Sequence, residues 1–119
     1  MAAILVIDDE PELLRNVAEL LELEGFEVIT SSDGPEAIRI LSERPIDLIL
    51  CDMLMKPMDG MKILRAIREN PATAAIPFVF ITGLRPDEIQ SGVAEASAYL
   101  IKPFTNDMLL RLVFEQLGL

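Results

Sequence analysis

The sequence predicts an α/β fold in which a five-stranded parallel sheet carries helices on both faces. Short apolar runs rich in β-forming residues recur along the chain, each too short for a helix. Segments with helical spacing separate them, and the runs are almost continuously apolar, as in strands buried on both faces. The expected strands are Ala3–Ile7, Phe26–Thr30, Leu48–Cys51, Phe78–Ile81 and Tyr99–Ile101. Right-handed crossovers through the helices would close a five-unit β/α sandwich.

The first expected helix, Glu12–Glu24, has the clearest pattern. Its leucine and valine side chains recur every three or four residues and form one apolar face. Pro11 suits the first turn, where its missing N–H breaks no helical hydrogen bond. Gly25 stands at the position where a left-handed residue ends many helices, so both ends of this helix are predicted.

Four further helices are expected from the same spacing. They are Pro35–Leu41, Gly60–Glu69, Asp87–Ala98 and Thr105–Leu117. Asp33, Asp59 and Thr105 are available as caps or near-caps. The pattern over 87–98 is the weakest, because Gly92 in a helix interior costs about 1 kcal/mol relative to alanine.

The composition narrows the possible partners. The 119 residues are 51% hydrophobic, which suits one domain over residues 1–119. The formal charge of −10 repels nucleic-acid phosphates and anionic membrane surfaces, so neither is expected as a direct partner. Because no stretch reaches transmembrane length and the N-terminus lacks signal-peptide features, we expect a cytoplasmic protein.

Two residue types limit the chemistry. Cys51 is the single cysteine, which excludes an internal disulfide and a cysteine-based zinc site. Histidine is absent, which excludes His-ligated metals and catalysis by Ser-His or Cys-His pairs. Any chemistry must therefore come from carboxylates, hydroxyls and amines.

Polar residues follow four of the five expected strands. Asp8 and Asp9 follow the first strand, Asp52 the third, Thr82 the fourth and Lys102 the fifth. In an open parallel sheet, ligands bind beyond the carboxyl ends of the strands. We therefore expect these five side chains to converge at one edge of the sheet.

The chemistry of this set is restrictive. Three carboxylates placed together repel unless one is protonated or a cation binds, and Mg²⁺ is the cation that such oxygens suit. We expect Asp9 and Asp52 to be direct ligands and Asp8 to bind directly or through water. Asp52 is also a candidate nucleophile toward phosphorus. Lys102 and the metal would neutralise the transferring oxygens, and Thr82 would donate a hydrogen bond to one of them.

Each residue alone also has a purely structural explanation. The pair Asp8-Asp9 is typical of an acidic helix start that interacts with the helix dipole. Asp52 and Thr82 are common turn residues, and Lys102 is consistent with an ordinary solvated lysine. Their occurrence together at four strand ends favours the functional interpretation.

Taken in order, these residues resemble the receiver domain of bacterial response regulators. The motifs are Asp8-Asp9, Asp52, Met55-Lys56-Pro57-Met58-Asp59-Gly60, Thr82 and Tyr99-Leu100-Ile101-Lys102-Pro103-Phe104. Together they cover essentially the whole chain. The resemblance implies a flavodoxin-like, doubly wound sheet with strand order 2-1-3-4-5.

The resemblance also implies a signalling reaction. Asp52 would accept a phosphoryl group from a phosphohistidine on a sensor histidine kinase or a histidine phosphotransfer protein, which agrees with the lack of histidine in this chain. Mg²⁺ would be held by Asp8, Asp9, Asp52 and the backbone carbonyl of Leu54. Beyond its own phosphorylation and dephosphorylation, the chain would not be an enzyme.

A conformational switch is implied as well. Thr82 would move toward the phosphoryl group and Tyr99 would turn into the space it leaves, which alters the surface of the fourth helix, fifth strand and fifth helix. That surface would contact a downstream effector or form a homodimer. An ordinary half-buried strand tyrosine is the alternative for Tyr99. Lys102-Pro103 matches the family's cis peptide, and X-Pro bonds adopt cis at low cost.

The sequence departs from the family pattern in places. Lys56 stands between Met55 and Pro57, where the family more commonly has proline directly after the methionine, so we expect a different loop geometry. The segment between Thr82 and Tyr99 is also shorter than usual, which puts the fourth helix in doubt as an output surface. Apolar side chains two residues after the acceptor and after the threonine predict slow loss of the phosphoryl group; they are Leu54 and Leu84.

The last expected helix has more apolar surface than a sheet requires. Its apolar residues span about 140° of a helical wheel, against a stripe of about 100° in an ordinary surface helix. We expect the surplus, chiefly Leu110, Phe114 and Leu117, to bind a partner, a second copy or an output domain. Deeper burial of an ordinary C-terminal helix is equally consistent with the pattern.

Two other functions remain open. A Mg²⁺-dependent aspartyl phosphatase would place its nucleophile after the first strand in an Asp-x-Asp pattern, whereas this chain has adjacent Asp8-Asp9 and little length for a substrate pocket. A pseudo-receiver, which binds partners without phosphotransfer, is disfavoured because no expected site residue is missing. Phosphorylation of Asp52 would separate the leading function from both.

Overall fold

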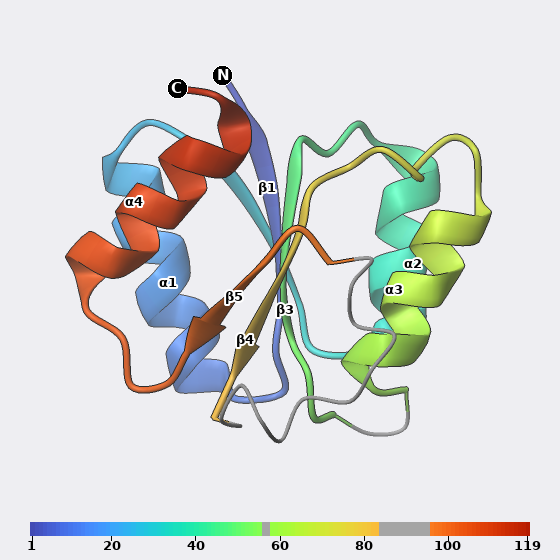
Figure 1. The fold of residues 1–119 in the computed structure, drawn as a ribbon, viewed down its shortest axis with the longest axis horizontal. Helices are drawn as coiled ribbons and strands as arrows, with labels where there is room; N and C mark the ends of the chain where they lie inside the picture. Colours follow the sequence, from blue (N-terminus) through green and yellow to red (C-terminus); the bar gives the residue numbers. More distant parts are fainter. Residues whose placement is uncertain (56–57, 84–95) are drawn as a thin grey trace.

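The computed structural model describes residues 1–55, 58–83 and 96–119 as a three-layer α/β sandwich (Figure 1). Its sheet has five parallel strands in the order β2-β1-β3-β4-β5, which confirms the predicted flavodoxin-like fold class. The strands are β1 Ala3–Ile7, β2 Glu27–Ser31, β3 Leu48–Asp52, β4 Phe78–Thr82 and β5 Ala98–Ile101. The helices within the described ranges are α1 Pro11–Leu23, α2 Gly34–Glu43, α3 Gly60–Glu69 and α4 Asn106–Leu117.

Helices cover both faces of the sheet, with α1 and α4 on one side and α2 and α3 on the other (Figure 1). Successive residues of β1 alternate between the two sides, so that Leu5 and Ile7 join one buried cluster and Ile4 and Val6 join the other. All residues of β1, β3 and β4 are buried. This two-sided burial explains the almost continuously apolar strand sequences.

The expected helix over 87–98 lies mostly outside the described residues, as does Gly92. Its expected end is wrong: Ala96 and Ser97 form a bend, and Ala98 already belongs to β5. The Ser97 N–H donates to the carbonyl of Phe78 at 2.8 Å, and the Ser97 hydroxyl accepts from the Phe78 N–H at 3.1 Å. These bonds to the start of β4 hold the segment extended and extend the sheet by one residue beyond the predicted strand.

The helix ends follow the expected signals closely. Gly25 has a left-handed φ of +93°, and the N–H of Phe26 reaches back to the carbonyl of Leu21, which gives α1 a Schellman-type end. The three expected caps are all used. Asp33, Asp59 and Thr105 accept the backbone N–H groups of Glu36, Lys62 and Met108 at 2.7, 3.0 and 3.1 Å.

In the ranges that the structure describes, no helix combines the length and the apolar character that crossing a bilayer requires.

Candidate functional site

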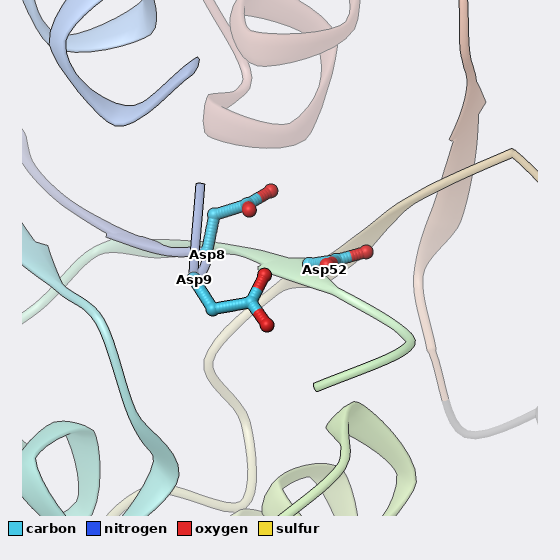
Figure 2. A group of neighbouring side chains, drawn as sticks. All are labelled: Asp8, Asp9 and Asp52. Atoms are coloured by element: carbon cyan, nitrogen blue, oxygen red, sulfur yellow. The ribbon is translucent and has the colours of Figure 1, made fainter. Parts of the chain in front are cut away.

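Three carboxylates converge at the carboxyl edge of the sheet. Asp8 and Asp9 directly follow β1, and Asp52 is the last residue of the neighbouring strand β3. One carboxylate oxygen from each lies within 4.8 Å of the others. Figure 2 shows the three side chains projecting into the same space. The parallel pairing of β1 with β3 therefore brings together residues that are far apart in the sequence.

Asp8 is the most deeply buried of the three, with 1% of its surface exposed. Its Oδ1 accepts the backbone N–H of Glu10 at 2.9 Å, whereas its Oδ2 has no hydrogen-bond partner in the described part of the chain. Burial raises the pKa of Asp8 to about 6, and the charge of Asp52 adds to this, while the Glu10 N–H and Lys102 oppose it. Asp8 thus holds a buried oxygen that no hydrogen bond from the described residues satisfies, with the Lys102 ammonium 3.7 Å away.

Asp52 is buried at the end of β3, with 8% of its surface exposed. Its Oδ1 lies 3.5 Å from the backbone nitrogen of Leu54, a long hydrogen bond at best. Burial raises the pKa of Asp52, and the positive charge of Lys102 opposes this most strongly. Within the described part of the chain, this long contact leaves most of the oxygen lone pairs of Asp52 available.

Lys102, the residue directly after β5, places a positive charge beside the carboxylates. Its Nζ lies 3.7 Å from Asp8 Oδ2, 3.9 Å from Asp52 Oδ1 and 4.0 Å from Glu10 Oε2. Its backbone N–H donates to the carbonyl of Thr82 at 2.7 Å, and the Lys102–Pro103 peptide bond is cis. Sequence reasoning did not single out Glu10, whose only signal is its position directly after two aspartates.

The donor set fits a hard divalent cation. The site offers several carboxylate oxygens, one of them buried without a hydrogen bond, and no histidine or thiolate among its acidic ligand candidates. Mg²⁺ prefers such oxygens and usually keeps several waters as well. A bound cation would relieve the repulsion that, together with burial, raises the pKa of Asp8.

Thr82 lies on β4, the strand next to that of Asp52, and Tyr99 lies on β5, one strand further out. Thr82 is the buried last residue of β4, and the residue before it, Ile81, pairs with Asp52. Tyr99, on β5, pairs with Phe80 of β4 and stacks on its ring, with centroids 6.2 Å apart and planes 15° apart. The ring of Tyr99 is half-buried against the α2/α3 side of the core, and burial raises its pKa.

The loop after β3 borders an open cavity of about 380 Å³ lined by Asp9, Leu54, Met55 and Asp59. Leu54 is 62% exposed there, so a large apolar side chain stands beside the acidic site. The unusual Lys56-Pro57 sequence and Leu84 lie outside the described residues. Slow phosphoryl loss therefore stays a prediction that rests, in this structure, on Leu54 alone.

Gly60 is a second residue whose importance the sequence did not reveal. A Cβ atom at this position would lie 2.5 Å from the carbonyl oxygen of Asp52 and 2.7 Å from the ring of Phe80. The Gly60 N–H also donates to the carbonyl of Met53 at 3.0 Å. The first residue of α3 therefore touches the backbone of the phosphoacceptor candidate. The available signal was a glycine directly after the Asp59 cap.

The apolar surplus expected on the last helix is largely used inside the molecule. Leu110, Phe114 and Leu117 are half-buried against the α1/α4 side of the core. The ring of Phe114 lies 5.8 Å from that of Phe26, centroid to centroid. Met108, at 48% exposure, is the large apolar side chain of α4 that faces solvent. Phe26, which was expected to begin the second strand, precedes β2 and covers part of the apolar surface of α4.

Both a family model and curated relatives match most of this chain. The family model described as the response regulator receiver domain matches residues 4–114. The response regulator PleD of Caulobacter vibrioides is 40% identical over 110 residues, which make up 91% of this chain and 24% of PleD. This chain therefore spans less than a third of that relative.

Solved structures agree in fold over nearly the full length. The chemotaxis response regulator CheY4 of Vibrio cholerae is 30% identical, with a TM-score of 0.92 and coverage of 98% of each chain. The receiver domain of the sensor histidine kinase PA1611 from Pseudomonas aeruginosa is 28% identical, with a TM-score of 0.90 and coverage of 99% of this chain and 98% of that one. That domain holds a magnesium ion in its active-site cleft. The present chain belongs to the response regulator receiver domain family, the signalling modules of two-component systems.

Proposed function

We propose that Asp52 is the phosphoacceptor of a two-component phosphorelay. The donor would be a phosphohistidine on a sensor histidine kinase or a histidine phosphotransfer protein, because this chain has no histidine of its own. An oxygen of Asp52 attacks the phosphorus atom, the P–N bond breaks, and its electron pair leaves on the imidazole nitrogen of the donor. The product on this chain is an aspartyl phosphate.

One observation carries the choice of Asp52 over Asp8. Both carboxylates lie within 4 Å of the Lys102 ammonium, but Asp8 is less exposed and its Oδ1 is engaged by the Glu10 N–H at 2.9 Å. Asp52 has a long contact with the Leu54 nitrogen, and Leu54 and Met55, which follow it in the same loop, line the open cavity after β3. An incoming phosphoryl group therefore meets Asp52 first.

Asp8, Asp9, Asp52 and the backbone carbonyl of Leu54 would hold Mg²⁺. The ion supplies charge neutralisation for the oxygens of the phosphoryl group. Lys102 would contribute a second positive charge from the opposite side, and the Thr82 hydroxyl would donate a hydrogen bond to one phosphoryl oxygen. The magnesium ion recorded in the PA1611 receiver supports this part of the proposal.

The signal would leave through the surface next to Thr82 and Tyr99. Movement of Thr82 toward the phosphoryl group would open space for the Tyr99 ring, which now stacks on Phe80. The surface that changes would include β5, α4 and the segment over 84–95. It would contact a downstream effector, an output domain or a second copy, and the matched relative PleD is much longer than this chain.

The wider context belongs to the same proposal. We take residues 1–119 as one receiver domain, since the family model covers 4–114 of them. A cytoplasmic location would place the domain beside the kinases that receiver domains serve. Direct contact with nucleic acid or membrane is not proposed for this domain, because its formal charge is −10.

Intact-mass measurement tests the acceptor directly. Wild-type protein incubated with Mg²⁺ and acetyl phosphate should gain one phosphoryl group, whereas Asp52→Asn and wild type in EDTA should gain none. A wild-type protein that stays unmodified while it binds partners would point to a pseudo-receiver. Equal modification of Asp52→Asn would refute the assignment, and steady turnover of small phosphoesters would favour the phosphatase alternative.

A further inference from the structure

Lys102 has a third acidic neighbour that does not belong to the metal-binding set. Its ammonium nitrogen lies 4.0 Å from Glu10 Oε2, compared with 3.7 Å from Asp8 and 3.9 Å from Asp52. None of these separations is short enough for a hydrogen bond. The position of the ammonium group is therefore a balance of three attractions, of which one, from Glu10, pulls outward toward solvent.

The location of Glu10 suits such an outward pull. Glu10 is the N-cap residue of α1, but its side chain makes no capping hydrogen bond. Instead its carboxylate approaches Lys102, while its backbone N–H holds Asp8. The Glu10 side chain is 61% exposed and that of Lys102 is 28% exposed, so the pair sits at the rim of the site.

A cavity beside Glu10 and Lys102 leaves space for their side chains to move apart. Glu10 and Lys102 line the same cavity of about 410 Å³, which lies between α1 and the loop joining β5 to α4. Leu13, Phe104 and Asn106 are among the other residues around it. Lys102 can thus be held on the outer side of the acidic cluster without displacing buried side chains.

We propose that Glu10 is a positioning residue that restrains Lys102 at the rim of the site and so opposes its movement onto a phosphoryl group at Asp52. This inference rests on the proposed phosphoacceptor function. When a phosphoryl group adds negative charge at Asp52, the ammonium must move inward and away from Glu10. Glu10 therefore favours the unmodified state over the phosphorylated state. Because the pair is exposed, its effect is small, about two- to fivefold in an equilibrium.

Beryllofluoride, a stable phosphoryl mimic, measures this effect at saturating Mg²⁺. We expect Glu10→Gln to bind it about two- to fivefold more tightly than wild type in an NMR titration. Glu10→Asp keeps the charge but is one methylene shorter and no longer reaches Lys102, so it should bind as tightly as Glu10→Gln. Glu12→Gln, in the first turn of α1, makes the same change of net charge and should bind like wild type.

Each other outcome has a definite meaning. If Glu10→Asp binds like wild type, or if Glu12→Gln matches Glu10→Gln, a general charge effect explains the result and the inference is overturned. If Glu10→Gln still tightens binding when Lys102 is also replaced by Gln, Glu10 does not act through Lys102. If wild type binds beryllofluoride but the Glu10 variants are unchanged, this inference alone fails; if wild type does not bind, the proposed function fails with it.

Discussion

Individual atoms decide most of the chemistry at this site, and the Oδ2 atom of Asp8 is the clearest case. It is a buried carboxylate oxygen with no hydrogen bond among the described residues. Folding thus places Asp8 where its charged form is disfavoured, and its pKa rises from 3.8 to about 6. A site that binds a cation tightly can be expected to weaken the metal-free fold in this way.

The first prediction concerns the loss of folding stability that the buried charge of Asp8 causes in the absence of metal. Because the folded pKa of Asp8 lies above the unfolded value, its stabilising contribution is complete below pH 3.8 and is lost as the pH rises through about 6. Metal-free protein should therefore be more stable at pH 5 than at pH 7, by about 1 kcal/mol. Asp8→Asn should raise the free energy of unfolding at pH 7 by about 1–3 kcal/mol.

Urea denaturation in EDTA at both pH values tests this expectation. Addition of Mg²⁺ should stabilise wild type and leave Asp8→Asn nearly unchanged. Asp9→Asn is the matched control, since it removes an exposed carboxylate of the same triad. An Asp8→Asn protein that is less stable than wild type at pH 7 without metal would contradict the account.

The second prediction concerns Gly60. Its missing side chain leaves the Asp52 carbonyl oxygen 2.5 Å from where a Cβ would stand, so Gly60→Ala forces the backbone of β3 and α3 apart. We expect a loss of about 1–3 kcal/mol in the free energy of unfolding, together with slower phosphorylation by acetyl phosphate. Gly83→Ala is the control, because a Cβ there meets no atom of the described residues within 4 Å. Equal stability of the two variants would show that the close approach does not matter.

At the scale of secondary-structure elements, α4 shows that apolar side chains beyond those needed to cover a sheet can pack inside the molecule. The helix carries more apolar side chains than the sheet alone needs, and Phe26 outside the sheet takes up part of them. The pair Phe26 and Phe114 is distant in sequence, so no helical pattern could reveal it. Phe114 therefore also contributes to an internal contact between α4 and Phe26, which follows the end of α1, and its role in binding a partner stays a prediction.

The third prediction follows from this contact. Phe114→Ala should lower the free energy of unfolding by about 1–3 kcal/mol, because it removes a half-buried ring and its aromatic contact. Phosphorylation of Asp52 should persist under conditions where the variant is folded. Met108→Ala on the exposed side of α4 should change stability by less than about 0.5 kcal/mol. Denaturation measures the role of Phe114 in packing, and size-exclusion chromatography measures its role in association. If Phe114→Ala alters association and leaves the free energy of unfolding unchanged, Phe114 belongs to an interface.

At the scale of the whole molecule, the sequence predicted the sheet well because its signals are local and repeated. Strands such as β1 and β3 are buried on both faces and are therefore apolar at every position. The site followed from a general property of parallel sheets, whose carboxyl ends meet at one edge. Asp8, Asp9 and Asp52 meet there as expected.

What sequence reasoning missed depends on approach in three dimensions. Gly60 matters because it touches the backbone of Asp52, and Glu10 because it reaches a lysine more than ninety residues away in the chain. Neither contact follows the periodicity of a helix or a strand, so a sequence pattern could not predict it. The start of β5 was misplaced for a similar reason, since Ser97 is held by Phe78 of another strand.

The edge position of β5 has a consequence for how the site comes apart. Asp8 and Asp52 are attached to interior strands, whereas Lys102 is attached to an edge strand in which Leu100 alone is buried and the other residues are partly exposed. Local opening costs least where few buried contacts must be broken, so β5 should fray at a lower free energy than β1 or β3. The amide protons of β5 would then exchange with solvent while those of the inner strands stay protected. During such local opening, the three carboxylates would stay in place while Lys102 moves away, so we expect the lifetime of an acyl phosphate at Asp52 to depend on how often β5 opens.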